Sequence, residues 1–556
     1  MCAIVRLPIA LKLSWPQGRD RGTDFQAILD LCAPCHYSRF TFCATKSVYW
    51  ENAALQAEPY RFTCHKRLMR IHPLDLAIVI AYLLGVTALG MRFRRSKKEV
   101  AGTNREAVSL DYFLGGKTAP WWALAFSIVA TETSTLTIIG TPAIAYAGNM
   151  TFIQLVFGYL IGRVLIVILL LPGYFRGQFL TAYALIEKRF GEKMRAVAAS
   201  TFLITRAIAE GVRVSAIALV VSVVLGTSEH LAVVIVIALT ILYTFEGGMT
   251  AVIWTDVAQL LLYITGSLFT FGILIHRIPG GWTEVAQVAA AAGHKLQFLD
   301  FTFDITTKYT FWSGLIGGAF LTMASHGTDQ TIVQRLLAAR NEKDSRRALL
   351  TSGVIVLIQF TIFLLIGVLL YVFSQHTPLL APGARTDSIL PLFLVREMPS
   401  GLAGLLLASI VAVAMSNASG SLNSLAASSV LDFSKLRGRS ADSVKFLRLS
   451  RRMTLIWGLI LMAFGFIKWG PLLEAGLTVA SLPFGSLLGL FLLGTLDRKA
   501  TATGALAGMF LGLATILCVW RYTDVAFTWY VLIGAAVTFA VGLAVSRIQE
   551  KQNVPA

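Results

Sequence analysis

The sequence predicts an all-α polytopic membrane protein, and three observations lead to this fold class. Hydrophobic residues make up 56% of the 556 residues and charged residues only 14%, which differs strongly from the composition of soluble globular proteins. Charge-poor stretches recur from His72 to Ser546, and many reach the ~20 residues that a helix needs to cross the ~30 Å hydrocarbon core. Backbone groups in lipid must be paired within the protein, so spans of this length should be helices.

About thirteen such spans follow one another along the chain. They lie at 73–91, 121–147, 151–175, 196–225, 230–245, 252–276, 309–334, 349–375, 399–431, 453–468, 471–495, 501–520 and 527–546. Basic residues gather in alternate loops, at 92–98, 176–195, 335–347, 435–452 and 498–499. Because Lys and Arg are enriched in cytoplasmic loops, this pattern predicts a multi-pass protein of the cell membrane with its N-terminus outside and its C-terminus in the cytoplasm.

The net charge of +18 raises the question of nucleic-acid binding, because basic patches bind phosphate. The basic residues lie in short loops between apolar spans, which argues against that class. The sequence also has no nucleotide-binding loop, no HExxH metal motif and no nucleophile elbow, so it is not predicted to be an enzyme.

Residues 1–70 differ from the rest of the chain and are expected to be a poorly ordered extension. They hold five of the six cysteines, and Cys32-Ala-Pro-Cys35-His36 has the spacing of c-type haem attachment. An alternative is that this stretch precedes the true start and that Met69 is the initiating residue. Whichever start is used, residues 71–120 are expected to supply the first transmembrane helix and a cytoplasmic loop.

The span 121–147 carries an unusual polar cluster at the depth of the membrane centre. Glu132 stands among five hydroxyl residues, which are Thr131, Thr133, Ser134, Thr135 and Thr137. A carboxylate at this depth is costly and normally faces a partner or a cavity. Oxygen ligands of this kind suit a small hard cation. We therefore expect Glu132 and Ser134 to take part in cation or proton coupling, with helix–helix packing by the hydroxyls as the alternative.

Two further spans carry polar residues near their middle. These are Met415–Ser424 within 399–431, and Ser325–Gln330 within 309–334 after a glycine-rich start. Interrupted spans at corresponding positions of two halves indicate a transport site at the membrane midplane. We expect helical regularity to be lost in these places. The two halves would be inverted repeats at 121–276 and 309–496, with two peripheral helices and a tail at 497–556.

Charged residues also occur within the spans that follow the first polar cluster. Arg206, Glu210 and Arg213 lie on one helical face, so that Glu210 can pair with both arginines in an intramembrane ion network. Arg163 lies in the middle of span 151–175. One of these arginines could instead meet an anionic group of a solute. His326 is either a satisfied polar residue or a proton relay.

Three motifs resemble blocks of the sodium:solute symporter family over roughly 72–500. They are Tyr243–Gln259 (YTFEGGMTAVIWTDVAQ), Asp329–Arg340 (DQTIVQRLLAAR) and Thr181–Gly191 (TAYALIEKRFG). The resemblance implies a LeuT-type core of ten helices in two inverted five-helix repeats, with alternating access to a central site. It also implies a co-transported sodium ion, no organic cofactor, a small-molecule solute as partner within the lipid bilayer, and a functional monomer.

The resemblance further implies a sodium site between the first and eighth core helices. Its ligands would be the carbonyls of Ala130, Thr133 and Val413 and the side chains of Ser416 and Asn417. Most members of the family have Ser or Thr where this chain has Asn417. Glu132 matches the position of an Asp that serves sodium coupling in the proline carriers of the family.

The solute class is narrowed by two departures from the sugar-carrying branch. Thr137 stands where those proteins have a sugar-contacting Gln, and Ser325 where they have a gate Tyr. Gly140–Ala143 is more similar to the branch that carries monocarboxylates, vitamins and iodide. A small organic anion or an amino acid is therefore favoured over a simple sugar. The candidate solute-binding residues are Thr137, Arg163, Thr322, Ser325 and His326.

Sodium-coupled symport is thus the leading hypothesis. A proton-coupled transporter of the same fold is the nearest alternative, in which Glu132 or His326 would titrate. A membrane sensor built on a symporter core is a second alternative. It would need a soluble signalling domain, and only about ten residues follow Ser546.

Overall fold

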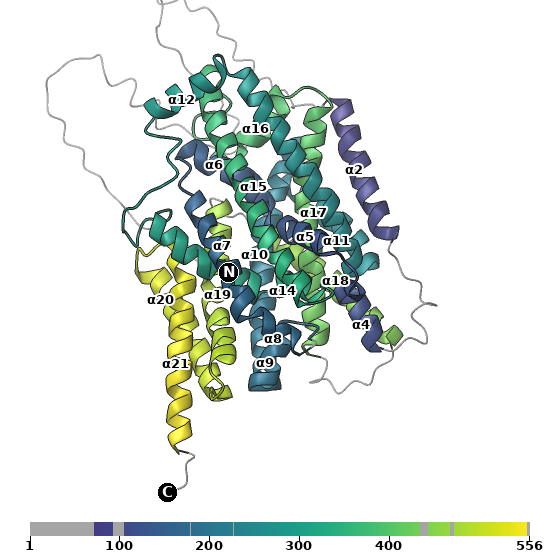
Figure 1. Cartoon of the computed structure of the whole chain (residues 1–556). Coiled ribbons are helices and arrows are strands. Elements are labelled where there is room, and N and C mark those ends of the chain that lie inside the picture. The colour runs from purple at the N-terminus through teal and green to yellow at the C-terminus, as the bar shows by residue number, and fades with distance from the viewer. Residues whose placement is uncertain are drawn as a thin grey trace, which may run out of the picture. The chain divides into compact units, whose positions relative to one another are not determined.

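A computed structural model of the chain describes residues 72–92, 105–177, 179–225, 227–433, 443–467 and 472–552. These residues form helices joined by loops and contain no β-strand, as expected for an all-α protein (Figure 1). The haem-like motif, Met69 and the rest of the cysteine-rich segment lie outside the described residues. The helices belong to one compact unit, Arg67–Ala556.

The helices of the first half begin with α2 and end with α12. Their bounds are α2 Pro73–Arg92, α4 Arg105–Leu114, α5 Trp121–Glu132, α6 Thr135–Ala147, α7 Ile153–Leu169, α8 Leu171–Phe175, α9 Tyr183–Phe190, α10 Glu192–Leu225, α11 Glu229–Arg277 and α12 Gly281–Ala291. Those of the second half are α13 Gly318–Gly327, α14 Gln330–Leu337, α15 Glu342–His376, α16 Ile389–Glu397, α17 Leu402–Leu431, α18 Ser443–Gly465, α19 Leu472–Leu496, α20 Ala502–Tyr522 and α21 Tyr530–Gln552. A π-helical turn, Ser313–Gly317, precedes α13.

Among the described residues, six helices are long and apolar enough to cross a membrane, and the bent pair α5–α6 makes a seventh. This supports the multi-pass prediction without confirming thirteen spans. Several expected spans are shorter or more charged, such as α7 and α10. Large apolar side chains such as Leu84, Ile168 and Phe510 are more than half exposed, which suits helix faces that meet lipid rather than water.

Two expectations about helix regularity are wrong. A loop was expected between spans 230–245 and 252–276, but the backbone of α11 stays helical from Glu229 to Arg277. A loss of regularity was also expected within 399–431, but α17 is one continuous helix. Its polar side chains do not break it, because Ser424 Oγ donates to the carbonyl of Gly420 (2.7 Å) and Ser421 Oγ to Glu210 (2.8 Å). Polar residues can therefore be satisfied locally and between helices without breaking the ladder.

The other two predicted interruptions are present. Helices α5 and α6 are separated at Thr133 and Ser134, and their axes differ by 62°. Helices α13 and α14 are separated at Thr328 and Asp329, where Asp329 caps α14 by accepting from the N–H of Thr331 (2.7 Å). The first helix of each predicted repeat is thus broken.

Helix α7 packs closely on the π-helical turn and α13 because the facing residues are glycines. A Cβ placed on Gly158 would lie 2.3 Å from the carbonyl oxygen of Gly314 and 2.7 Å from that of Leu315. These contacts are backbone to backbone, so no side-chain rotation can relieve them. Small residues at such contacts let transmembrane helices approach and pack without a hydrophobic driving force.

The close approach of α7 predicts that Gly158→Ala destabilises the protein by ~1–3 kcal/mol, the usual effect of overpacking. The matched control is Gly272→Ala in α11, because a Cβ there meets nothing within 4 Å. Thermal unfolding of the detergent-solubilised protein would measure both. Equal midpoints for the two variants would contradict the packing of α7 described here.

Candidate functional site

The break between α5 and α6 is held in an extended conformation by side chains from distant helices. Thr133 and Ser134 have ψ angles of 106° and 169°, outside the helical range. Ser134 caps α6 through Thr137, whose Oγ1 accepts from the N–H of Ser134 (3.2 Å). Gln359 of α15 donates to Thr133 Oγ1 (2.7 Å), and Tyr263 of α11 donates to Gln359 Oε1 (3.2 Å). Side chains of three helices, α6, α11 and α15, therefore define one irregular pair of residues.

The last carbonyls of α5 have no amide partner within their own helix, as at any helix end. Two of them, those of Ala130 and Thr133, point toward α17. There they accept from Nδ2 of Asn417, at 3.4 and 2.6 Å, and the carbonyl of Val413 accepts from the same nitrogen at 3.1 Å. The three carbonyls that the family resemblance implies as sodium ligands thus converge on one atom. The side chain of Ser416, the remaining implied ligand, lies outside the described part of the structure.

Glu132, at the end of α5, is not a free carboxylate. It forms a direct ion pair with the guanidinium of Arg163 from α7, and Arg163 is 1% exposed. His326 Nε2 of α13 lies 3.3 Å from Glu132 Oε2, and Ser325 Oγ lies 2.9 Å from His326 Nδ1. Arg163 also donates to the carbonyl of Tyr159 (3.2 Å). The buried arginine is therefore neutralised by the protein itself.

A second charged group spans α10, the α13–α14 break and α17. Glu210 Oε2 lies 3.4 Å from Arg206 and 3.3 Å from Arg213, so the structure brings together the three residues of the expected network. Arg206 is also 3.6 Å from Asp329 Oδ2. Arg213 Nη1 donates to Asn417 Oδ1 at 3.3 Å. This network therefore touches the carbonyl cluster through Asn417.

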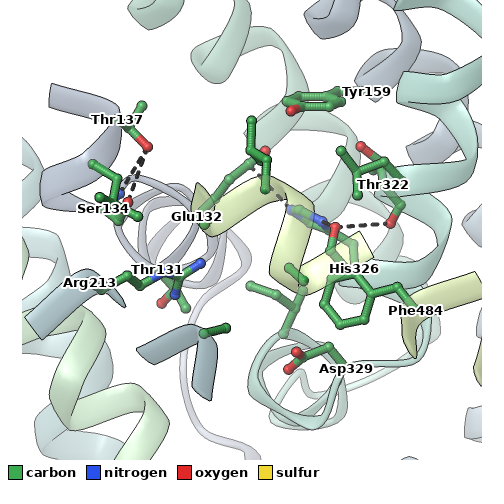
Figure 2. Close-up of a pocket in the computed structure, with 18 of the residues that line it drawn as sticks. Thr131, Glu132, Ser134, Thr137, Tyr159, Arg213, Thr322, His326, Asp329 and Phe484 are labelled. Atoms are coloured by element: carbon green, nitrogen blue, oxygen red, sulfur yellow. Dashed lines mark hydrogen bonds and ion pairs between the residues drawn. The ribbon is translucent and has the colours of Figure 1, made fainter. Parts of the chain in front are cut away.

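One cavity, with about 1070 Å³ of empty space, lies between these groups (Figure 2). Of the candidate residues, those that line it are Glu132, Ser134, Thr137, Arg206, Arg213, Thr322, Ser325 and His326. Arg163, which pairs with Glu132, does not line it, and neither do Glu210 and the carbonyl cluster.

Sequence reasoning missed part of the cavity wall. Tyr159 could have been found, because it lies one helical turn before Arg163 on the same face of α7. Asp329 stands in the polar stretch that was singled out, but its side chain was not predicted to face the cavity. Leu477 and Phe484 of α19 also line the cavity, and no pattern distinguishes them from lipid-facing or core residues.

Comparison with known proteins gives a consistent result. The sequence model described as "Sodium:solute symporter family" matches residues 112–512. The chain is 30% identical over 481 residues to a sodium/sialic acid symporter of Aliivibrio fischeri, covering 84% of this chain and 92% of that protein. It is 30% identical over 456 residues to the human sodium/iodide cotransporter, covering 80% of this chain and 69% of that protein.

A solved structure is also similar to this chain. It is the substrate-bound outward-open state of a Na⁺-coupled sialic acid symporter, with a TM-score of 0.77 and 28% sequence identity. The match covers 85% of this chain and 98% of that one. Shared fold and shared sequence therefore point to the same family.

The Glu132–Arg163 pair predicts strong non-additivity between substitutions. Glu132→Gln leaves the buried guanidinium without a counter-charge, and Arg163→Met leaves the carboxylate without one, so each should destabilise the protein by ~3–5 kcal/mol. The double variant should be more stable than either single variant. Thermal midpoints of the four purified proteins measure the coupling. Additive losses would show that the two side chains do not depend on each other.

Proposed function

Because this chain belongs to the sodium:solute symporter family, we propose that it uses the inward sodium gradient to carry a small organic anion into the cell by alternating access. Sodium as the co-transported ion is confirmed at the level of the family. The family and these relatives are transporters, and the proposal contains no covalent step. The class of solute, the side of the membrane on which each terminus lies and the two inverted repeats are part of the proposal.

The proposed sodium site is the carbonyl cluster at the end of α5. Ala130, Thr133 and Val413 supply uncharged oxygens that converge on one point, which is what a small hard cation needs when it sheds water. Both helices that contribute are buried here, so the ion would be dehydrated on both sides. The repeats proposed at 121–276 and 309–496 are supported by the broken helix at the start of each.

The observation that carries the anion proposal is the position of the α6 N-terminus. Residues of its first turn, Leu136 and Thr137, and the cap residue Ser134 all line the cavity. A helix N-terminus has unpaired N–H groups and a partial positive charge, so it favours a carboxylate. Broken transporter helices use this end to hold anionic solute groups. The relatives named above carry sialic acid or iodide, which are anions at neutral pH.

Hydroxyl groups around the cavity would bind the rest of the solute. Thr137 and Ser134 lie at one side of the cavity in Figure 2, and Thr322 and Ser325 line it from α13. Phe152 and Phe360 close part of the wall with apolar surface. This combination of a few polar groups and apolar walls is typical of small-molecule sites. It suits a carboxylate on a polar or mixed organic body better than a bare inorganic ion.

Purified full-length protein should be stabilised against heat by an organic anion in a sodium-dependent manner. Two species that bind to the same state stabilise each other reciprocally, so the shift should be larger in sodium chloride than in choline chloride. Sialic acid, pyruvate and lactate are suitable first solutes, with glucose as the neutral comparison. Stabilisation by glucose alone, or by anions equally in both salts, would contradict the proposed function.

Thr137→Val should weaken the solute-dependent shift by about three- to tenfold in half-saturating concentration, the value of one hydrogen bond. Thr141→Val is the matched control. It removes a buried hydroxyl of the same helix that has no hydrogen-bond partner and does not line the cavity. Similar effects of the two substitutions would remove Thr137 from the proposed solute site.

A further inference from the structure

The side-chain amide of Asn417 has an orientation that its neighbours determine. On one side it faces the carbonyl oxygens of Ala130, Thr133 and Val413, which can only accept hydrogen bonds. On the other side it faces the guanidinium of Arg213, which can only donate. The nitrogen must therefore point to the carbonyls and the oxygen to Arg213, and Asn417 is 1% exposed.

The amide nitrogen occupies the point that the proposed sodium ion would take. An amide NH₂ has two hydrogens, whereas three carbonyl oxygens lie at 2.6, 3.1 and 3.4 Å from Nδ2. The cluster thus offers more acceptors than the amide has donors. Such a set of converging oxygens is better matched to a cation, which has no fixed number of donor directions.

Sodium can bind here with Asn417 as a ligand only after the amide turns round. A half-turn about χ2 is a soft motion, because this torsion is broad and two-fold. The turn puts Oδ1 where Nδ2 was, so the side chain must also draw back from the three carbonyls for the ion to lie between their oxygens and Oδ1. Nδ2 would then face Arg213, and two donors would meet. The turn is favourable only when Arg213 moves away from Asn417.

The surroundings of Arg213 allow its side chain to move away from Asn417. Its side chain is 21% exposed, shares Glu210 with Arg206 and lines the same cavity as the N-terminus of α6. Glu210 keeps Arg206 as a partner when Arg213 leaves, so its carboxylate is not left unpaired. An anion in the cavity offers Arg213 a new partner of the right charge.

From these contacts we infer that the Arg213–Asn417 hydrogen bond couples sodium to the anionic solute, an inference that rests on the proposed function. With the bond made, the Asn417 amide fills the sodium site and Arg213 is held away from the solute. Sodium binding turns the amide and releases Arg213 to the cavity. An anion that takes Arg213 frees the amide to turn and so favours sodium. Each ligand thereby raises the affinity for the other by the same factor.

The test uses sodium alone as the probe. Competition between the Asn417 amide and sodium for the three carbonyls can be measured without the solute. Thermal midpoints of the full chain in detergent are recorded as sodium chloride replaces choline chloride at constant ionic strength. Asn417→Ser and Arg213→Met should each lower the half-saturating sodium concentration by about tenfold or more, the value of a hydrogen bond to a charged group. The double variant should gain little more, because both substitutions remove the same contact.

Two further results separate the coupling contact from other effects. Without sodium, Asn417→Ser should be less stable than the unmodified protein, because three buried carbonyls lose their donor. This variant also decides the matter if Arg213→Met does not fold. Arg206→Met removes the same charge from the same helix but does not touch Asn417, so its effect on sodium should be smaller than that of Arg213→Met.

Three outcomes would overturn the inference or its premise. A weaker or absent sodium response in Asn417→Ser would mean that the amide is an obligatory ligand rather than a competitor. Equal effects of Arg206→Met and Arg213→Met on the half-saturating sodium concentration would mean that general charge repulsion, and not the Arg213–Asn417 contact, opposes sodium binding. If no protein, including the unmodified one, responds to sodium, the proposed sodium coupling itself fails.

Discussion

The structure depends on one constraint, which is that carbonyl oxygens released inside a membrane must find partners within the protein. At Thr133 and Ser134 the helical ladder stops, and the Thr133 carbonyl accepts from Asn417 of α17. The Thr133 hydroxyl accepts from Gln359 of α15, which in turn accepts from Tyr263 of α11. These three helices are therefore tied to one irregular point. When a sodium ion replaces the amide as the partner of the carbonyls, the contacts of all three helices with this point change. Binding at one point can therefore alter the packing of the helix bundle.

Charge balance is the second general feature of the interior. Glu132 is neutralised by Arg163, and the group of Arg206, Arg213, Glu210 and Asp329 contains two charges of each sign. A buried unpaired charge is costly, so an interior balanced in this way resists the entry of a lone ion. A sodium ion and a monovalent anion that enter together leave the balance unchanged. The electrostatics of the bundle thus fit the proposed co-transport of sodium with an organic anion.

The sequence predicted those features that depend on residue type within one segment. The break near Glu132 and the break near Asp329 were expected, because hydroxyl, amide and carboxylate groups are concentrated there. The same signal failed for α17, where serine hydroxyls return to their own helix or bond to a neighbour. Contacts between distant segments could not be predicted. The pairing of Glu132 with Arg163, and the apolar wall from α19, are set by packing, and the sodium ligands came only from family resemblance.

An experimental structure determined in sodium chloride, beside one in choline chloride, tests the central claim most directly. Cation density is expected between the carbonyl oxygens of Ala130, Thr133 and Val413 in sodium only, with the oxygen of Asn417 turned toward it and Arg213 displaced. The choline structure should retain the contacts described here. Sodium bound elsewhere, with the Asn417 amide nitrogen still facing the three carbonyls, would contradict it.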